Sequence, residues 1–132
     1  MPRQPSKVFN DKELEIMKIV WHLGEATGKE IQARLPGEPH YNSVLTIIRV
    51  LERKGHVVHR AEGKTHFYRA GESKEKARTR LLRHLVDHVF SGSAASVVLN
   101  LVQVGDLTPQ DLDDIRRKIA GTHKEKKDRG HK

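Results

Sequence analysis

Apolar residues recur at helical spacing through the first 55 residues of the chain. The pattern predicts a helix over residues 11–23, a short helix over residues 28–35, and a third helix that begins near Asn42 and ends before Gly55. The positions expected to face inward are Leu14, Met17, Val20, Trp21, Ile31, Leu35, Val44, Ile48 and Leu51. Three short helices within about 45 residues, joined by tight turns, are typical of a helix-turn-helix arrangement.

Capping residues mark where the first two helices begin. Asn10 precedes Glu13 by three positions, and Thr27 precedes Glu30 by three positions. This spacing is that of a capping box, in which each side chain accepts a hydrogen bond from the other residue's backbone N–H. The helix starts are therefore predicted at residues 11 and 28.

The segment HVVHRAEGKTHFYRA, residues 56–70, has a different pattern. Two runs rich in Val, Phe and Tyr flank the turn EGKT, which predicts a β-hairpin. A helix-turn-helix followed directly by a hairpin is a winged helix.

Helical spacing returns after Gly71. The pattern predicts a longer helix over residues 73–90. Residues 91–105 are apolar nearly all round, which in a helix implies burial on more than one side. A last helix is predicted after Thr108, with Asp111 at its third position. The expected fold class is therefore mainly α: a winged helix-turn-helix N-terminal domain plus a C-terminal three-helix dimerisation region.

We divide the chain accordingly. Residues 1–9 are expected to form a flexible arm, residues 10–71 a winged-helix DNA-binding domain, residues 72–121 a helical dimerisation domain, and residues 122–132 a basic disordered tail.

The C-terminal helices carry more apolar surface than one copy of the chain can cover. Exposed apolar patches of that size mark interfaces, and a twofold dimer covers both copies with one surface. The residues expected at the dimer interface are Leu82, Leu85, Val89, Val98, Leu101, Val102, Leu112, Ile115 and Ile119.

A polar stripe lies on the third helix. Asn42, Thr46, Arg49 and Arg53 recur at i, i+4, i+7 and i+11, so all four share one face. In a winged helix this helix enters the major groove, where Asn42 and Thr46 offer hydrogen bonds to bases. Arg49 could contact guanine or a phosphate, and Arg53 a phosphate. The alternative is an ordinary solvated helix face.

Three further residues belong to the predicted DNA surface. Leu45 is a candidate for apolar contact with thymine methyl groups. Lys64 at the hairpin tip and His66 beside it are expected to contact backbone phosphates, which fix register without reading sequence.

Composition supports a polyanionic partner. The chain has 132 residues, with 25 Lys and Arg against 17 Asp and Glu, and a net charge of +8. Nucleic acid is the first candidate and an anionic membrane surface the second. The absence of cysteine excludes disulfides, thiol nucleophiles and cysteine-based zinc sites. No signal peptide is evident, and the longest apolar run is well short of the about 20 residues that span a bilayer, so we expect a cytoplasmic protein without stable membrane association.

From about Phe9 to Ile119 the sequence resembles the penicillinase-repressor family, which includes BlaI, MecI and CopY. ELEIMKIVWHLGEATGKEIQARL is similar to its first two helices, SVLTIIRVLERKGHV to its recognition helix, EGKTHFYRA to its wing, and GSAASVVLNLVQVGDLTPQDLDDIRRKI to its dimerisation region. Ser43 stands at a usual threonine of the recognition helix, which adds it to the candidate DNA contacts. The resemblance implies a homodimeric repressor of an inverted-repeat operator, in antibiotic response, with no catalytic activity and no cofactor.

The resemblance also implies a mode of control. Several members are released from DNA after a membrane-bound sensor metalloprotease signals and the dimerisation region is cleaved. In a segment like VVLNLV the cut would fall between Asn100 and Leu101. The alternative for Asn100 is an asparagine that hydrogen-bonds across the dimer and fixes its register.

Two departures bear on these implications. Many members have arginine before the leucine of LxxKG, where this chain has Val50, so the operator sequence is expected to differ. The copper-responsive members carry C-terminal cysteines, which this chain lacks, so copper control by that route is not expected.

The sequence contains weaker signals for other functions. His84 and His88 are spaced i, i+4 on a helix, and His56, His59 and His66 lie around the hairpin, but no distinctive further ligand accompanies them, so no metal site is predicted. A ligand- or metal-sensing regulator without proteolytic control remains the alternative function. A winged helix used as a protein–protein adaptor is a third possibility. An enzyme is disfavoured, because no phosphate loop, carboxylate pair or activated nucleophile is evident.

Overall fold

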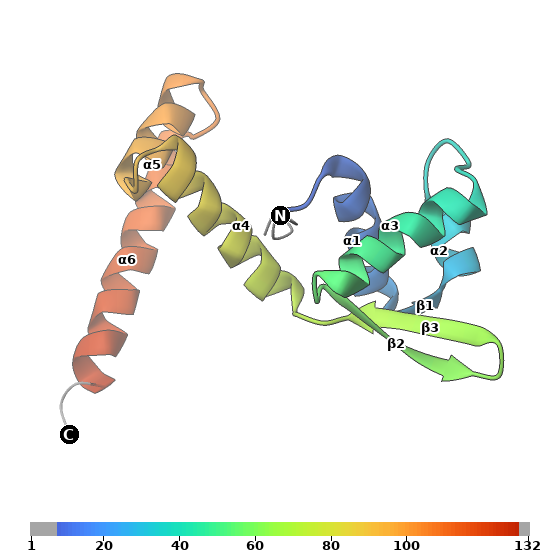
Figure 1. The fold of residues 1–132 in the computed structure, drawn as a ribbon. Coiled ribbons are helices and arrows are strands. Elements are labelled where there is room, and N and C mark those ends of the chain that lie inside the picture. The colour runs from blue at the N-terminus through green and yellow to red at the C-terminus, as the bar shows by residue number, and fades with distance from the viewer. Residues whose placement is uncertain (1–7, 130–132) are drawn as a thin grey trace. The chain divides into compact units, whose positions relative to one another are not determined.

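The computed structural model describes residues 8–129, with side chains described for residues 8–122. The chain forms two compact units that divide between His84 and Leu85. The elements are α1 (Asp11–Leu23), β1 (Glu25–Thr27), α2 (Gly28–Arg34), α3 (Tyr41–Arg53), β2 (Val57–Glu62), β3 (Thr65–Ala70), α4 (Lys74–Val89), α5 (Ala94–Gln103) and α6 (Pro109–Arg129). The predicted fold class is confirmed: helices dominate, and α1 to α3 with the β2–β3 hairpin form a winged helix-turn-helix (Figure 1).

Both predicted capping boxes begin their helices. The backbone N–H of Glu13 donates to Asn10 Oδ1 at 2.8 Å, and the N–H of Asn10 donates to Glu13 Oε1 at 2.9 Å. Thr27 and Glu30 make the same reciprocal pair at the start of α2. These bonds satisfy backbone donors that no helical carbonyl can reach, which is why the two helices start where the sequence predicts.

The winged-helix core consists mainly of buried apolar side chains. Val44, Ile48 and Leu51 of α3 face inward as predicted. The other fully buried large residues are Ile16, Met17, Val20, Ile31 and Val57. On α1 the buried face differs from the predicted stripe, because Leu14 and Trp21 are only half-buried.

One acidic residue lies inside this core. The Glu13 side chain is 4% exposed, and its Oε2 lies 3.0 Å from Nζ of Lys54, whose side chain is 12% exposed. Lys54 is the C-cap residue of α3. The pair therefore ties the start of α1 to the end of α3, through a carboxylate that the sequence indicated only as a capping group.

The sheet has a third strand that was not predicted. Its order is β1-β3-β2, both pairs antiparallel, with Thr27 of β1 opposite Phe67 of β3 and Phe67 opposite Arg60 of β2. Arg60 lies over the Phe67 ring, with its guanidinium carbon 4.4 Å from the ring centroid, and reaches Glu25 of β1 with two hydrogen bonds of 2.7 and 2.9 Å. A strand of three residues is too short to produce a recognisable alternation of apolar and polar positions.

The N-terminal unit extends beyond both of its predicted bounds. Residues 1–7 of the predicted flexible arm lie outside the described residues, but Phe9 of that arm is buried, with its ring centroid 4.5 Å from that of His56. At the other end Ala77 is fully buried in the same core, and the Trp21 indole N–H donates to the Glu72 carbonyl at 3.1 Å. The first turns of α4 therefore belong with the winged helix, and the division falls after His84 instead of at residue 71.

His56 is buried in this packing, and its pKa is lowered. Burial lowers its pKa from the ordinary 6.5, and the nearby Arg80 lowers the pKa further, while Glu72 opposes both. The main partner of the Glu72 carboxylate is Arg80, whose Nη2 donates to Glu72 Oε1 at 2.6 Å. The lowered pKa favours the uncharged imidazole, which packs against Phe9 and lies with its Nδ1 3.5 Å from Glu72 Oε1.

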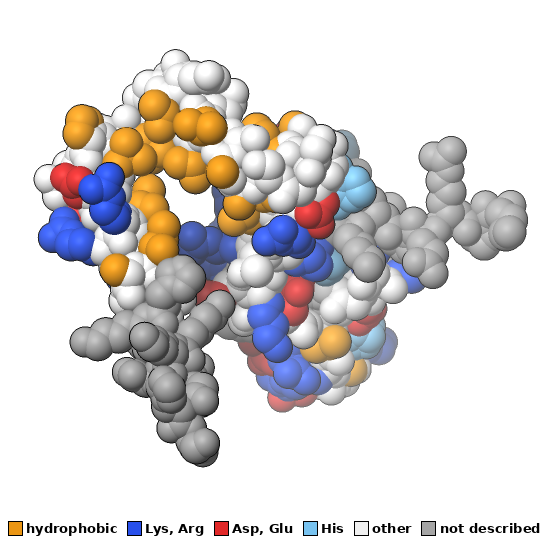
Figure 2. Space-filling model, turned by 90° about the vertical axis from the view of Figure 1, so that its left-hand side faces the viewer, with side chains coloured by type: hydrophobic (Ala, Val, Ile, Leu, Met, Phe, Trp, Pro, Cys, Tyr) orange, Lys and Arg blue, Asp and Glu red, His pale blue; other side chains and the backbone are white. Residues whose placement is uncertain are grey.

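The C-terminal unit covers little of its own apolar surface. Within residues 85–122 Val86 is the one buried side chain, and α5 has none. The large apolar residues exposed in this unit are Leu85, Val89, Leu99, Val102, Val104, Leu112, Ile115 and Ile119. Figure 2 shows hydrophobic side chains gathered on the surface of this unit.

The last helix begins as predicted and ends later than predicted. Thr108 and Asp111 cap α6 with reciprocal hydrogen bonds of 2.9 and 3.1 Å, and the bond from the Thr108 backbone lowers the pKa of Asp111. The predicted disordered tail, residues 122–132, is helical as far as Arg129. Lys, Glu and Arg are good helix formers, so the charged segment continues α6. Residues 130–132 lie outside the described residues.

No single helix among the described residues is long and apolar enough to cross a membrane. The helices α4 and α5 reach the required length and composition only when taken together, across a break that bends them by 87°.

Candidate nucleic-acid interface

The helix α3 has one buried face and one exposed face. Its buried side is held by Val44, Ile48 and Leu51, which fixes the rotation of the helix about its axis. All four residues of the predicted stripe, Asn42, Thr46, Arg49 and Arg53, are exposed. Because the apolar face of α3 packs against the core, the polar face is exposed to solvent.

The Thr46 hydroxyl is oriented by its own helix. Its Oγ1 donates to the carbonyl oxygen of Asn42 at 2.9 Å. With its proton used in this bond, the hydroxyl can offer only acceptor lone pairs, and its methyl group, to a ligand. Those features suit an exocyclic amino group of cytosine or adenine, or a thymine methyl group.

The N-terminal end of α3 has neither a capping side chain nor an acidic residue to offset its helix dipole. Its N-cap residue His40 makes no side-chain capping bond, and its first turn holds no acidic residue. The backbone N–H groups of that turn and the positive end of the helix dipole are thus left without a side-chain acceptor. Phosphate oxygens bind at helix ends of this kind.

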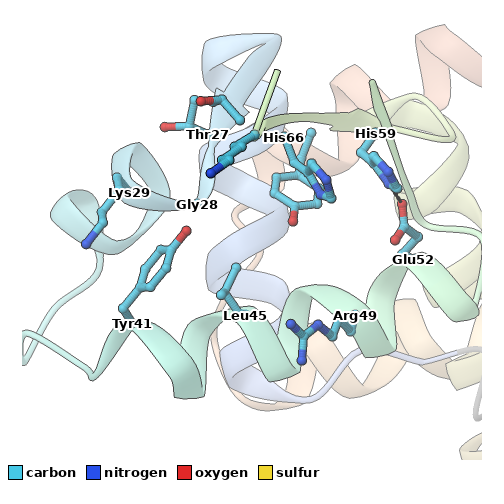
Figure 3. A pocket seen from close by; sticks show the side chains of 12 residues that line it. Thr27, Gly28, Lys29, Tyr41, Leu45, Arg49, Glu52, His59 and His66 are labelled. Carbon is cyan, nitrogen blue, oxygen red and sulfur yellow. Dashed lines mark hydrogen bonds and ion pairs between the residues drawn. The ribbon is translucent and has the colours of Figure 1, made fainter. Parts of the chain in front are cut away.

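A groove lies between α3, the start of α2 and the hairpin. It has a volume of about 410 Å³ and is lined by four predicted DNA contacts, Leu45, Arg49, Lys64 and His66. Its lining also includes residues that were not among the predicted DNA contacts: Thr27, Gly28, Lys29, Tyr41, Glu52, His59, Thr65 and Tyr68. Figure 3 shows Tyr41, Leu45 and Arg49 on successive turns of α3, with Tyr41 and Leu45 pointing into this groove.

The remaining predicted contacts lie elsewhere. Asn42, Thr46 and Arg53 do not line the groove, and Ser43 lines a smaller, more apolar pocket together with Ile47 and Lys12. Leu45 is half-buried against α2, so it points into the groove and not outward. A helical spacing of i+4 from Tyr41 to Leu45 and to Arg49 was the signal that could have identified this second face.

The hairpin ends in a two-residue turn. Gly63 has φ +59°, and Lys64 follows it before Thr65, which pairs with Glu62. A glycine at positive φ in the first turn position is typical of a type II′ hairpin. The turn leaves Lys64 exposed at the tip of the wing.

The wing histidines contact each other and α3. The rings of His59 and His66 are stacked, with centroids 4.4 Å apart, and His59 Nδ1 contacts the Glu52 carboxylate of α3. These contacts fix the wing against the recognition helix. Among the described residues no group of three or more His, Asp or Glu side chains is arranged to hold a metal ion.

A winged helix with an exposed cationic face on its third helix and a basic hairpin tip has the architecture of a DNA-binding module. Comparison with known proteins supports this assignment to the DNA-binding proteins. The penicillinase repressor family model matches residues 9–121, so the chain belongs to this family. It is a transcriptional repressor of the DNA-binding type and not an enzyme.

Individual relatives are distant but cover most of the chain. The methicillin resistance regulatory protein MecI of Mammaliicoccus sciuri is 25% identical over 112 residues, covering 82% of this chain and 89% of MecI. The penicillinase repressor of Bacillus licheniformis is 22% identical over 121 residues, covering 90% and 94%. The solution structure of the DNA binding domain of the repressor BlaI has 25% identity and a TM-score of 0.48, covering 56% of this chain and 90% of that one.

Proposed function

We propose that the protein is a homodimeric repressor that binds an inverted-repeat operator with α3 of each copy in the major groove. The observation that carries this proposal is the division of α3 into a fully buried apolar face and an exposed face that bears Arg49 and Arg53. The role of Lys64 and His66 as phosphate contacts, and of Asn42, Ser43, Leu45 and Thr46 as base or groove contacts, is part of the same proposal.

Dimerisation is supported by the exposed apolar residues of the C-terminal unit. Leu99 and Val104 are 61% and 62% exposed, and neither was in the predicted interface. Val98 and Leu101, which were predicted, are half-buried within the protomer. Full burial of an exposed large apolar side chain contributes about 1.5–3 kcal/mol. The exposed apolar residues of this unit are 36–65% exposed, so each contributes part of that amount when a second copy covers it.

Two copies would place two recognition helices on one duplex, on half-sites about 34–36 Å apart. The test is a selection of bound duplexes from a random pool, which should return mirrored half-sites. The same selection with Arg49→Ala should lose preference at one position per half-site, with a cost of about 1–3 kcal/mol, if Arg49 reads a base.

Arg53→Ala is the matched control, because Arg53 lies one helical turn on and is expected to contact a phosphate. It should weaken binding to all duplexes equally. A selection that returns single half-sites, or no sequence at all, would contradict the proposed operator.

We further propose that repression is relieved by cleavage between Asn100 and Leu101 after signalling by a membrane sensor metalloprotease. Support comes from the position of this bond inside α5, with Asn100 exposed. A cut there separates α6 and its apolar residues from α4. Mass spectrometry of the chain from induced cells should find a fragment that ends at Asn100, and an intact chain under induction would overturn the proposal.

A further inference from the structure

Cationic side chains from three different elements line the groove beside α3. Lys29 comes from α2, Arg49 from α3 and Lys64 from the tip of the wing, and Glu52 is the one acidic residue in its lining. The Glu52 carboxylate is in contact with His59. The lining is therefore positively charged, and Lys29 is the one of these three cations that was not among the predicted DNA contacts.

Gly28 makes room for an aromatic ring at the edge of this groove. A Cβ at Gly28 would lie 3.1 Å from Tyr41 Oη and 3.2 Å from Leu45 Cδ2. Its φ is not in the left-handed region, so the backbone conformation does not require glycine. The missing side chain instead allows Tyr41 and Leu45 to lie directly against the first residue of α2.

The Tyr41 ring in turn holds Lys29. The Lys29 ammonium lies 4.2 Å from the ring centroid, within the range of a cation–π interaction. Figure 3 shows the Lys29 amine beside the ring, with the Tyr41 hydroxyl directed toward Gly28. An exposed lysine normally loses rotamer freedom when it binds, so a lysine already held in place binds an anion at a lower entropic cost.

We propose that Lys29 is a backbone-phosphate contact and that Tyr41 is its positioning residue. This inference rests on the proposed DNA-binding function and deepens it. The ligand is the phosphodiester backbone of double-stranded DNA, contacted on the groove that α2, α3 and the wing share. Lys29 contributes affinity without reading sequence, as phosphate contacts do.

The experiment measures log K against log salt for a duplex of random sequence, with the full chain. Lys29→Gln should reduce the steepness of the slope by about 0.9 per protomer, which corresponds to about fivefold weaker binding per protomer near 0.15 M salt. Lys18→Gln is the matched control, since Lys18 is an exposed α1 residue that lines neither the groove nor the pocket beside Ser43. A slope change in Lys29→Gln no larger than that in Lys18→Gln overturns the proposal.

A double-mutant cycle tests the positioning role. Tyr41→Leu should weaken binding in the wild-type background and have no effect in the Lys29→Gln background, whereas Tyr41→Phe, which keeps the ring, should bind like wild type. Equal weakening by Tyr41→Leu in both backgrounds overturns the role, and thermal unfolding of each variant identifies loss of fold. A wild-type chain that binds no duplex overturns the proposed function itself, while normal wild-type binding with an unchanged Lys29→Gln slope overturns only this inference.

Discussion

Ile115→Asp should convert the protein into monomers and reduce its affinity for an inverted-repeat duplex by about 10²–10⁴-fold. Ile115 lies on the exposed apolar stripe of α6 between Leu112 and Ile119. A carboxylate at that position would have to be buried unpaired in the proposed interface, which strongly disfavours association. Without the partner copy, the gain of about 10²–10⁴ that comes from linking two binding modules is lost.

The control is Ala120→Asp, which introduces the same charge on α6. Ala120 is exposed and lies about 140° around the helix from Ile115. Light scattering should find Ile115→Asp monomeric and Ala120→Asp dimeric at equal concentration. The winged helix of both variants should stay folded, because both positions lie outside its unit. A dimeric Ile115→Asp variant would place the interface elsewhere.

The sequence predicted those parts of the fold whose signals are local. The capping boxes at Asn10 and Thr27 are formed by residues three positions apart, and the inward positions of α3 follow a strict helical spacing. Such signals need no knowledge of distant residues. Three short helices followed directly by a hairpin then indicated a winged helix.

The features that sequence analysis missed depend on long-range contacts. The strand β1 exists because β3 pairs with it, some 40 residues away in the chain. Phe9 is ordered by the rings of Trp21 and His56, and Lys29 acquires a role only because Tyr41 lies beside Gly28. Of the candidate DNA surface, the α3 stripe was predictable from spacing, and the groove shared with α2 was not.

The ion pair of Glu13 and Lys54 should have the largest effect on stability. Lys54→Met keeps the length of the side chain and removes its charge, which leaves the Glu13 carboxylate buried without its cation. Breaking a buried pair in this way costs about 3–5 kcal/mol. Urea unfolding should be measured in the Ile115→Asp background, so that dissociation of the proposed dimer does not contribute to the free energy of unfolding.

Glu13→Gln in addition to Lys54→Met should recover most of that loss. Glutamine can still accept the hydrogen bond from the Asn10 N–H that completes the capping box, and it carries no charge that needs a partner. The cycle thus separates the capping role of Glu13 from its pairing with the end of α3. If the losses from the two single substitutions simply add in the double variant, the carboxylate is stabilised by something other than Lys54, and the end of α3 is held on α1 by apolar packing alone.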